Sequence, residues 1–292
     1  MPWIQLSLQT DSKHFEQYED ALLEAGALSV TASDNADQPI LEPAPGETPI
    51  WEDVCVTGLF EADTDIKQAI SILKHSLGVD KLSTLQQTEL EDQEWARAWM
   101  EHFQPMPFGQ RLWVCPDGFE PPEPDAVNMR LDPGLAFGTG THPTTALCLE
   151  WLDGQPLENC TILDYGCGSG ILAIAALLLG AQSAYCVDND PQALTATVDN
   201  ADKNQVVSQI KTCLPDELPD IQSDVCVANI LAGPLKSLAP TLALHTRPGG
   251  RLILSGILRD QAEDVRQHYQ QWFDMRDAVF KEDWTRLEGI RK

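Results

Sequence analysis

The 292-residue sequence predicts an α/β protein with a parallel, doubly wound sheet from residue 107 onward and a smaller α+β domain over residues 1–92. Three observations predict this. From Thr161 onward, short apolar strand-like segments alternate with helix-like segments, which is typical of parallel sheets with helical crossovers. The first 92 residues show strands and helices in the order βαββαβ. The formal charge is −14 over residues 1–92 and −12 over residues 93–292, which indicates two parts with different tasks.

The N-terminal domain is predicted from side-chain alternation and from turn residues. Asp11 or Ser12 can cap a first helix that ends before Gly26, and a second, amphipathic helix ends near Gly78. The order is that of a ferredoxin-like module, and no motif in it indicates catalytic chemistry. The predicted elements are strands over 3–8, 27–32, 54–60 and 82–88, helices over 12–25 and 65–75, and an exposed loop over 34–50.

A connector over residues 93–106 is predicted to join the two domains. Residues 94–102 form a short helical pattern that carries Trp95 and Trp99, followed by Pro105 and Pro107. Positions four apart share a helix face, so the two indoles are expected to pack together. They can either form an aromatic platform for a substrate or fix the connector to a domain, and we favour packing.

The C-terminal domain, residues 107–292, is predicted to contain the parallel sheet. Its last two strands are close enough in sequence to form an antiparallel pair. The predicted strands cover 161–163, 184–187, 210–212, 225–228 and 252–255, then 275–280 and 284–290, and the predicted helices cover 171–179, 191–204, 234–244 and 260–271.

Composition excludes several classes of function. With 45 acidic and 19 basic residues the formal charge is −26, which repels nucleic acid and attracts a basic partner. The acidity can also reflect solubility alone or a salt-adapted organism. No export signal or membrane-spanning stretch is visible. The eight cysteines lack Cys-x-x-Cys spacing, so we expect reduced core thiols, no metal site and a cytoplasmic protein.

A glycine-rich loop follows the first strand of the C-terminal domain. Asp164 leads into Gly166, Gly168 and Gly170, and a helix follows at once. Such a loop lies at the carboxyl end of a strand, where open α/β sheets bind ligands. Asp188 ends the next strand, where a carboxylate can accept hydrogen bonds from both hydroxyls of a ribose. These residues predict a site for a cofactor that contains a nucleoside.

The glycine spacing leaves two cofactors to be weighed. Gly168, Gly170 and Ala173 formally fit the dinucleotide fingerprint G-x-G-x-x-G/A, which predicts NAD. Asp164 argues against NAD, because a carboxylate directly before the loop would repel a pyrophosphate but can hold the ammonium group of a methionine moiety.

Two further motifs lie near strand ends. Asn229 ends the fourth predicted strand, and its side-chain carbonyl can orient an amine nucleophile; capping a turn is the alternative. Phe137 to Thr145 form a Gly-, Thr- and Pro-rich loop that can fold over a cofactor, with Phe137 against it and a threonine hydroxyl hydrogen-bonded to it. His142 in this loop can act as a base, but a structural hydrogen-bonding role is favoured.

At these motifs the sequence resembles the PrmA family of class I S-adenosylmethionine-dependent methyltransferases. The resemblance covers nearly the whole chain, including Trp95-x-x-x-Trp99, the Phe137–Thr145 loop and Asn229-Ile230-Leu231-Ala232-Gly233-Pro234. It implies a Rossmann-like, seven-stranded methyltransferase sheet and an N-terminal domain that recognises the substrate. Thr145, Gly166, Asp188 and Asn229 fall on cofactor-contact positions, with Phe137 and Thr144 beside them.

The resemblance also implies the reaction. S-adenosylmethionine would methylate the N-terminal α-amine and lysine ε-amines of ribosomal large-subunit protein eleven, a basic protein, with Asn229 as the catalytic residue. Apart from the resemblance, we expect a monomer. Ile230 and Leu231 argue against an amide substrate, because related glutamine methyltransferases carry Asn-Pro-Pro-Tyr there. An NAD-dependent oxidoreductase, a non-enzymatic acidic chaperone and a lysine methyltransferase with another protein substrate remain as alternatives.

Overall fold

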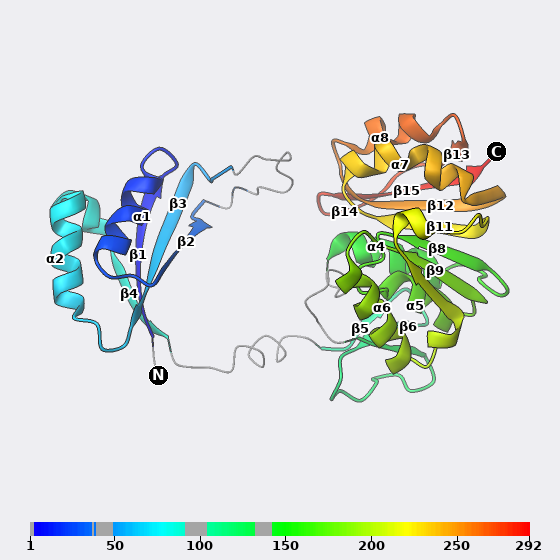
Figure 1. Cartoon of the computed structure of the whole chain (residues 1–292), viewed down its shortest axis with the longest axis horizontal. Coiled ribbons are helices and arrows are strands. Elements are labelled where there is room, and N and C mark those ends of the chain that lie inside the picture. The colour runs from blue at the N-terminus through cyan, green and yellow to red at the C-terminus, as the bar shows by residue number, and fades with distance from the viewer. Residues whose placement is uncertain (1–2, 37, 39–48, 91–103, 132–141) are drawn as a thin grey trace. The chain divides into compact units, whose positions relative to one another are not determined.

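The computed structural model describes residues 3–36, 38, 49–90, 104–131 and 142–292. The chain divides into two compact units, Met1–Ala98 and Trp99–Lys292, and each is described by itself (Figure 1). The predicted connector helix with Trp95 and Trp99 lies outside the described residues, and so does Phe137.

Unit 1 has the predicted βαββαβ order. Its sheet has the strand order β2-β3-β1-β4 with every pair antiparallel. Leu6 and Leu8 on the buried face of the sheet share one apolar core with Leu22 and Leu73 from the two helices. The elements are β1 (Trp3–Asp11), α1 (Phe15–Glu24), β2 (Ser29–Asp34), β3 (Asp53–Glu61), α2 (Ile66–Leu77), a 3-10 helix (Val79–Thr84) and β4 (Gln86–Leu90).

Several boundaries in unit 1 differ from the prediction by one to four residues, and two of these differences have a clear local cause. Helix α1 begins at Phe15 because Asp11 still belongs to β1, and its carboxylate accepts hydrogen bonds from the backbone N–H groups of Lys13 and His14 at 3.0 Å. The last strand begins at Gln86, not at residue 82. The chain leaves α2 at Gly78, whose φ is +90°, and forms the 3-10 helix first.

Unit 2 begins with a small sheet and a helix that the sequence patterns did not predict. The small sheet has the order β5-β6-β7. Asp153 at the end of α4 joins the helix to this sheet, because its carboxylate accepts hydrogen bonds from the backbone N–H groups of Gln110 and Arg111 at 2.6 and 3.1 Å. The elements are β5 (Met106–Phe108), β6 (Leu112–Cys115), β7 (Val127–Arg130) and α4 (Pro143–Asp153).

The main sheet of unit 2 has the order β10-β9-β8-β11-β12-β15-β13, with β14 paired to β15. The first five of these strands are parallel to one another, and β15 is antiparallel to its neighbours. The predicted antiparallel tail is therefore confirmed, but its first segment divides into β13 and β14. The strands are β8 (Thr161–Tyr165), β9 (Ser183–Val187), β10 (Ile210–Cys213), β11 (Ser223–Asn229), β12 (Thr246–Leu258), β13 (Phe273–Met275), β14 (Val279–Lys281) and β15 (Trp284–Arg291).

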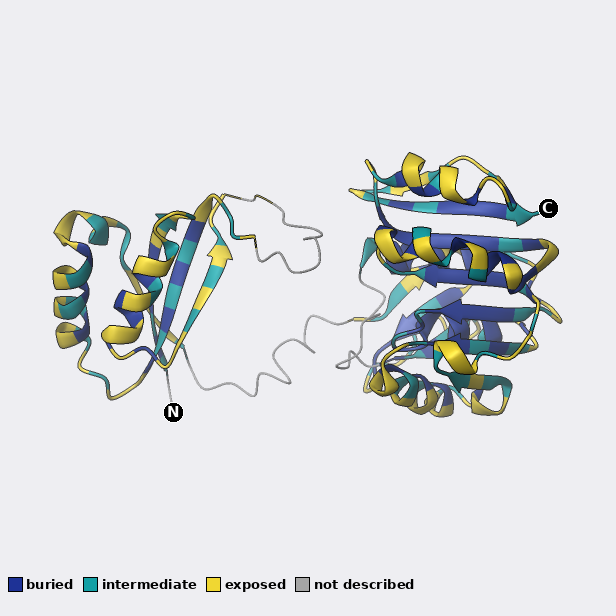
Figure 2. Cartoon of the chain, turned by 45° about the horizontal axis from the view of Figure 1, so that its top comes forward, coloured by how far each residue is buried: buried dark blue, intermediate teal, exposed yellow. Residues whose placement is uncertain are grey.

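Helices cover both faces of this sheet (Figure 1). The interior strands are the most buried part of the unit (Figure 2). Residues Ile171–Leu177 are all buried because α5 lies between the sheet and the elements α4 and β7. The helices are α5 (Ile171–Leu178) and α6 (Pro191–Lys203) on one face, with α7 (Ala232–Leu244) and α8 (Ala262–Tyr269) on the other, plus 3-10 helices at Val207–Gln209 and Pro215–Glu217.

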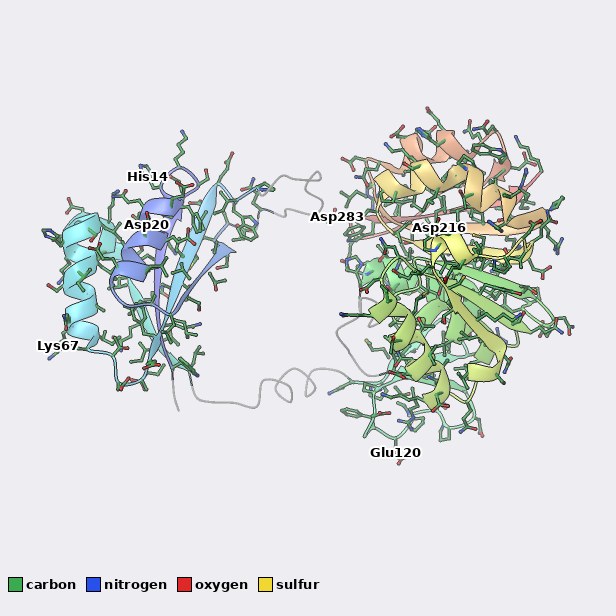
Figure 3. The ribbon with its side chains drawn as sticks, in the orientation of Figure 1. His14, Asp20, Lys67, Glu120, Asp216 and Asp283 are labelled. Atoms are coloured by element: carbon green, nitrogen blue, oxygen red, sulfur yellow. The ribbon has the colours of Figure 1, made fainter. Side chains whose placement is uncertain are left out.

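The acidic side chains lie mainly on the surface. Figure 3 labels Asp20 in unit 1 and Glu120, Asp216 and Asp283 in unit 2, all of which are exposed. None of the helices in the described part of the chain has the length and apolar content that crossing a membrane requires.

Candidate functional site

The candidate site lies at the carboxyl ends of β8, β9 and β11. The strand order reverses between β8, which is followed along the chain by β9, and β11 on its other side. Open α/β sheets bind ligands at such a switch point, because the loops that leave the two neighbouring strands diverge. The glycine loop, Asp188 and Asn229 follow or end these three strands.

The glycine loop is held in one conformation from several sides. Gly166, Gly168 and Gly170 all have φ in the left-handed region, at +79°, +53° and +77°, which favours glycine. A Cβ on Gly170 would lie 2.8 Å from Thr197 of α6. The Thr197 hydroxyl donates to the Gly168 carbonyl at 3.0 Å, and Asn200 donates to the Ser169 carbonyl at 2.9 Å. The loop is therefore preorganised by α6.

The backbone N–H groups of the loop are already used. Gly166 and Cys167 donate to the Val187 carbonyl at 2.7 and 3.1 Å, and Gly170 donates to the Cys167 carbonyl at 2.8 Å. Gly168 donates to Asp188 Oδ2 at 2.9 Å. A dinucleotide loop needs free N–H groups at the helix N-terminus to bind a pyrophosphate. Four of these donors are not free here.

Asp188 connects the glycine loop to the start of α6. Its second oxygen, Oδ1, accepts from the backbone N–H of Asp190 at 3.0 Å, and Asp190 in turn caps α6 by accepting from Gln192 at 2.8 Å. A carboxylate offers about four lone-pair directions, so the half-buried Asp188 side chain retains acceptor capacity for a ligand.

Asp164 lies beneath the loop. It is fully buried, and its Oδ2 accepts from the backbone N–H of Ala173 in the first turn of α5 at 3.1 Å. Its Oδ1 has no hydrogen-bond partner. Burial raises the pKa of the Asp164 carboxyl to about 7, and the nearby negative Asp188 adds to this rise. The carboxyl therefore caps α5 from the preceding strand and holds a proton more tightly than an exposed aspartate does.

Asn229 is the polar group whose arrangement is most specific. Its Nδ2 donates to the hydroxyl of Thr145 at 3.2 Å, and its Oδ1 has no hydrogen-bond partner. Thr145 is fully buried in the first turn of α4. The amide is thus fixed through its nitrogen, and its buried carbonyl oxygen keeps its full capacity to accept a hydrogen bond.

The first turn of α4 is attached to the sheet through Thr144. Ser255 of β12 donates from its hydroxyl to the Thr144 carbonyl at 3.1 Å. His142 caps the helix: its Nδ1 accepts from the Thr144 N–H at 3.4 Å and lies 2.7 Å from the Thr144 hydroxyl. Burial lowers the pKa of the His142 ring, and the ring packs edge-on against Trp284, with centroids 4.8 Å apart. The favoured structural interpretation of His142 agrees with these contacts.

The turn after Asn229 packs closely between two glycines. A Cβ on Gly166 would overlap with the Cγ2 atom of Ile230, and a Cβ on Gly256 would overlap with the Ile230 backbone. Gly256 has φ of +80°, at an irregularity in the pairing of β12 and β15. These contacts fix the glycine loop, the Asn229 turn and the end of β12 relative to one another.

The structure therefore joins several of the predicted residues directly. Asp188 contacts Gly168, and Asn229 contacts Thr145. Sequence reasoning missed Thr197, Ser255 and Gly256. Of these, only Gly256 could have been found from the sequence, because an isolated glycine in a strand pattern indicates a bulge or a close backbone approach. Within the described ranges, no group of three or more His, Cys, Asp or Glu side chains is placed to hold a metal ion.

Comparison with known proteins gives a consistent result. Residues 2–292 match the family model of "Ribosomal protein L11 methyltransferase (PrmA)". Two relatives named ribosomal protein L11 methyltransferase, from Shewanella sp. (strain ANA-3) and Shewanella sediminis (strain HAW-EB3), are 52% and 53% identical over 293 and 295 residues, which cover 100% of both chains in each case. The solved structure of a ribosomal protein L11 methylase from Lactobacillus delbrueckii subsp. bulgaricus is 34% identical, with a TM-score of 0.60, and covers 65% of this chain and 100% of its own.

Proposed function

The chain belongs to the ribosomal protein L11 methyltransferase (PrmA) family, and from this premise we propose that it transfers methyl groups from S-adenosylmethionine to amines of ribosomal protein L11. The proposed acceptors are the N-terminal α-amine and lysine ε-amines. We propose that it acts in the cytoplasm as a monomer, with unit 1 docking the basic substrate and unit 2 carrying out the transfer.

The residues at the switch point fit S-adenosylmethionine better than a dinucleotide. Asp188 has acceptor capacity for the two ribose hydroxyls. The occupied N–H groups of Gly166, Gly168 and Gly170 argue against a pyrophosphate. Phe137, Thr144 and Thr145 are proposed to complete the pocket beside Asp164 and the glycine loop. The cofactor supplies a methyl group on a sulfonium centre, and what remains for the protein is alignment of the acceptor amine.

The observation that carries the proposal is the anchored amide of Asn229. Its Nδ2 is fixed by Thr145 and its Oδ1 is unpartnered. An unpartnered buried oxygen is unfavourable unless a ligand completes its hydrogen bonding. An acceptor amine can donate an N–H to this oxygen and so direct its lone pair away from Asn229. Holding the amine in this way removes much of the entropic part of the barrier, so we assign Asn229 the catalytic role.

The second requirement is a neutral amine. A lysine with an ordinary pKa of about 10.4 requires about 4–5 kcal/mol to lose its proton at pH 7, whereas an α-amine near 7.7–8.0 requires about 1 kcal/mol. Leu231 remains 48% exposed directly after Asn229 and Ile230. Apolar surface here would desolvate an approaching ammonium and lower its pKa. The Nδ1 of His142 already caps α4 at Thr144, and we propose that water takes the proton.

The test uses radiolabelled S-adenosylmethionine and ribosomal protein L11 purified in its undermethylated form. The wild type should add methyl groups to L11, with the modified amines read by mass spectrometry. Asn229→Ala should lower kcat by about 10²-fold, the order expected for lost alignment. Asn128→Ala, a substitution in β7 that removes hydrogen bonds to the Glu123 and Ala126 carbonyls, is the matched control and should retain activity. Failure of the wild type to label L11 would refute the function, and full activity in Asn229→Ala would refute the role of Asn229.

A further inference from the structure

Unit 1 contains a groove of about 590 Å³ between the start of α1 and the segment that leads into β3. Phe15, Ile50 and Trp51 form its apolar part, and each is partly buried against the core of unit 1. A volume of this size falls within the range found for ligand sites. We call it the α1 groove; its lining residues are Ser12, Lys13, Phe15, Glu16, Glu19, Ala32, Pro49, Ile50 and Trp51.

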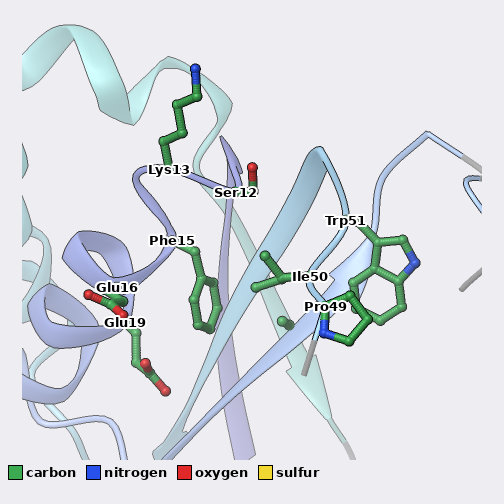
Figure 4. Close-up of a pocket in the computed structure, with 9 residues that line it drawn as sticks. Ser12, Lys13, Phe15, Glu16, Glu19, Pro49, Ile50 and Trp51 are labelled. Carbon is green, nitrogen blue, oxygen red and sulfur yellow. The ribbon is translucent and has the colours of Figure 1, made fainter. Parts of the chain in front are cut away.

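Two carboxylates border the apolar part of the groove. Glu16 and Glu19 are three residues apart on α1 and so share one side of the helix. Figure 4 shows both glutamates on one side of Phe15, with Pro49 and Trp51 on the other side, while the Lys13 side chain extends away from them. Neither glutamate has an ion-pair partner among the residues that the structure describes.

We propose that the α1 groove binds a lysine or arginine side chain of the basic protein substrate, together with an apolar residue next to it. This inference rests on the proposed function. The long aliphatic stem of such a side chain would pack on Phe15 and Ile50, with its cationic end at the two glutamates. Trp51 and Pro49 on the other side of Phe15 would contact the apolar residue next to it.

The charge of unit 1 supports this occupant. Residues 1–92 carry 18 acidic and 4 basic residues, so the groove lies in a field that attracts cations and repels anions. The apolar walls favour a side chain attached to a protein over a small hydrated cation, because burying apolar surface stabilises the complex further. The groove would therefore capture the substrate in unit 1 without contributing to the methyl transfer in unit 2.

The test measures methyl transfer to purified L11 by the full-length chain. The double variant Glu16→Gln/Glu19→Gln keeps the shapes of the side chains and removes both charges. Its KM for L11 should rise about 2- to 30-fold, the range for two partly exposed charge pairs. Its kcat and its KM for S-adenosylmethionine should remain unchanged. The KM for L11 should also depend less on ionic strength than in the wild type.

A control with the same change in charge elsewhere on unit 1 separates the groove from the general field. Asp63 and Glu89 are both exposed and lie outside the groove, so Asp63→Asn/Glu89→Gln should change the KM for L11 by less than about 2-fold. An equal rise of the KM for L11 in both double variants would overturn the proposal that the α1 groove binds the substrate. An unchanged KM for L11 in Glu16→Gln/Glu19→Gln would overturn it as well. Both of these outcomes leave the proposed function standing, whereas a wild type that fails to methylate L11 overturns both proposals.

Discussion

Replacing Gly166 by alanine tests the geometry of the glycine loop directly. Gly166 has φ of +79°, and a Cβ there would overlap with the Cγ2 methyl of Ile230. The left-handed conformation costs an alanine about 1–2 kcal/mol, and forcing a methyl group into packed surroundings costs about 1–3 kcal/mol more. We therefore expect Gly166→Ala to lower the free energy of unfolding by about 2–5 kcal/mol.

Two further variants separate the parts of this cost. In an Ile230→Ala background the overlapping methyl is absent, so Gly166→Ala should cost only the conformational part of about 1–2 kcal/mol. Gly154 is the matched control. Its φ is −81°, and the nearest atom to a Cβ there is the Trp151 carbonyl oxygen at 3.6 Å. Gly154→Ala should be neutral or stabilise the protein slightly, because it restricts the unfolded chain.

Thermal and denaturant unfolding measure these differences. For a unit of this size 1 kcal/mol shifts Tm by about 2–4 °C, so Gly166→Ala should lower Tm by about 4 °C at the least. Calorimetric titration with S-adenosylmethionine should also give weaker binding, since the displaced loop borders the proposed pocket. The reasoning would be refuted if Gly166→Ala had the Tm of the wild type. It would also be refuted if Gly166→Ala lowered the free energy of unfolding equally with Ile230 and with Ile230→Ala.

Two more predictions concern the carboxylates beside the loop. In calorimetry, Asp188→Ala should weaken S-adenosylmethionine binding by about 1.5–3 kcal/mol. The control Asp190→Ala removes the α6 cap and should mainly lower the free energy of unfolding, by about 1 kcal/mol. Equal affinities of Asp188→Ala and the wild type for S-adenosylmethionine would reject the ribose contact. Burial raises the pKa of folded Asp164 from 3.8 to about 7, so above pH 4 the unfolded chain releases a proton that the folded chain keeps. The wild type should therefore lose about 2 kcal/mol relative to Asp164→Asn as the pH rises from 5 to 7, and little more above it; parallel stability curves in denaturant unfolding would contradict this.

The parallel sheet could be predicted because its strands are short, strongly apolar runs separated by helical patterns. Helix α4 could not be predicted in the same way. Most of its residues are buried, including its first-turn pair Thr144 and Thr145, so it shows little amphipathic periodicity. Its start at His142 and Pro143 resembles a loop, although proline is favoured in the first turn of a helix. Strands β5 to β7 contain only three or four residues each, too few for alternation to be recognised.

The positions of Asp188 and Asn229 could be predicted because the ends of parallel strands meet at one edge of the sheet. Their partners could not. The hydrogen bond between Asn229 and Thr145 joins residues 84 positions apart, and that between Ser255 and Thr144 joins residues 111 positions apart. In each pair, the two residues lie in different elements, and no helical or strand periodicity in the sequence links one residue to the other. Such contacts follow from how α4 packs on the sheet, which no local sequence feature specifies.

Under the proposed function, the acidity of the chain and the need for a neutral amine act against each other. A negative field attracts a basic substrate but also raises the pKa of the amines it carries, which makes them harder to deprotonate. The role proposed for Asn229 would reduce this conflict. A carboxylate at that position would stabilise the ammonium form, whereas the amide oxygen accepts an N–H without a full negative charge. With a neutral acceptor beside the exposed Leu231 and the densest charge in residues 1–92, the proposed capture and the proposed deprotonation would be favoured in different parts of the molecule.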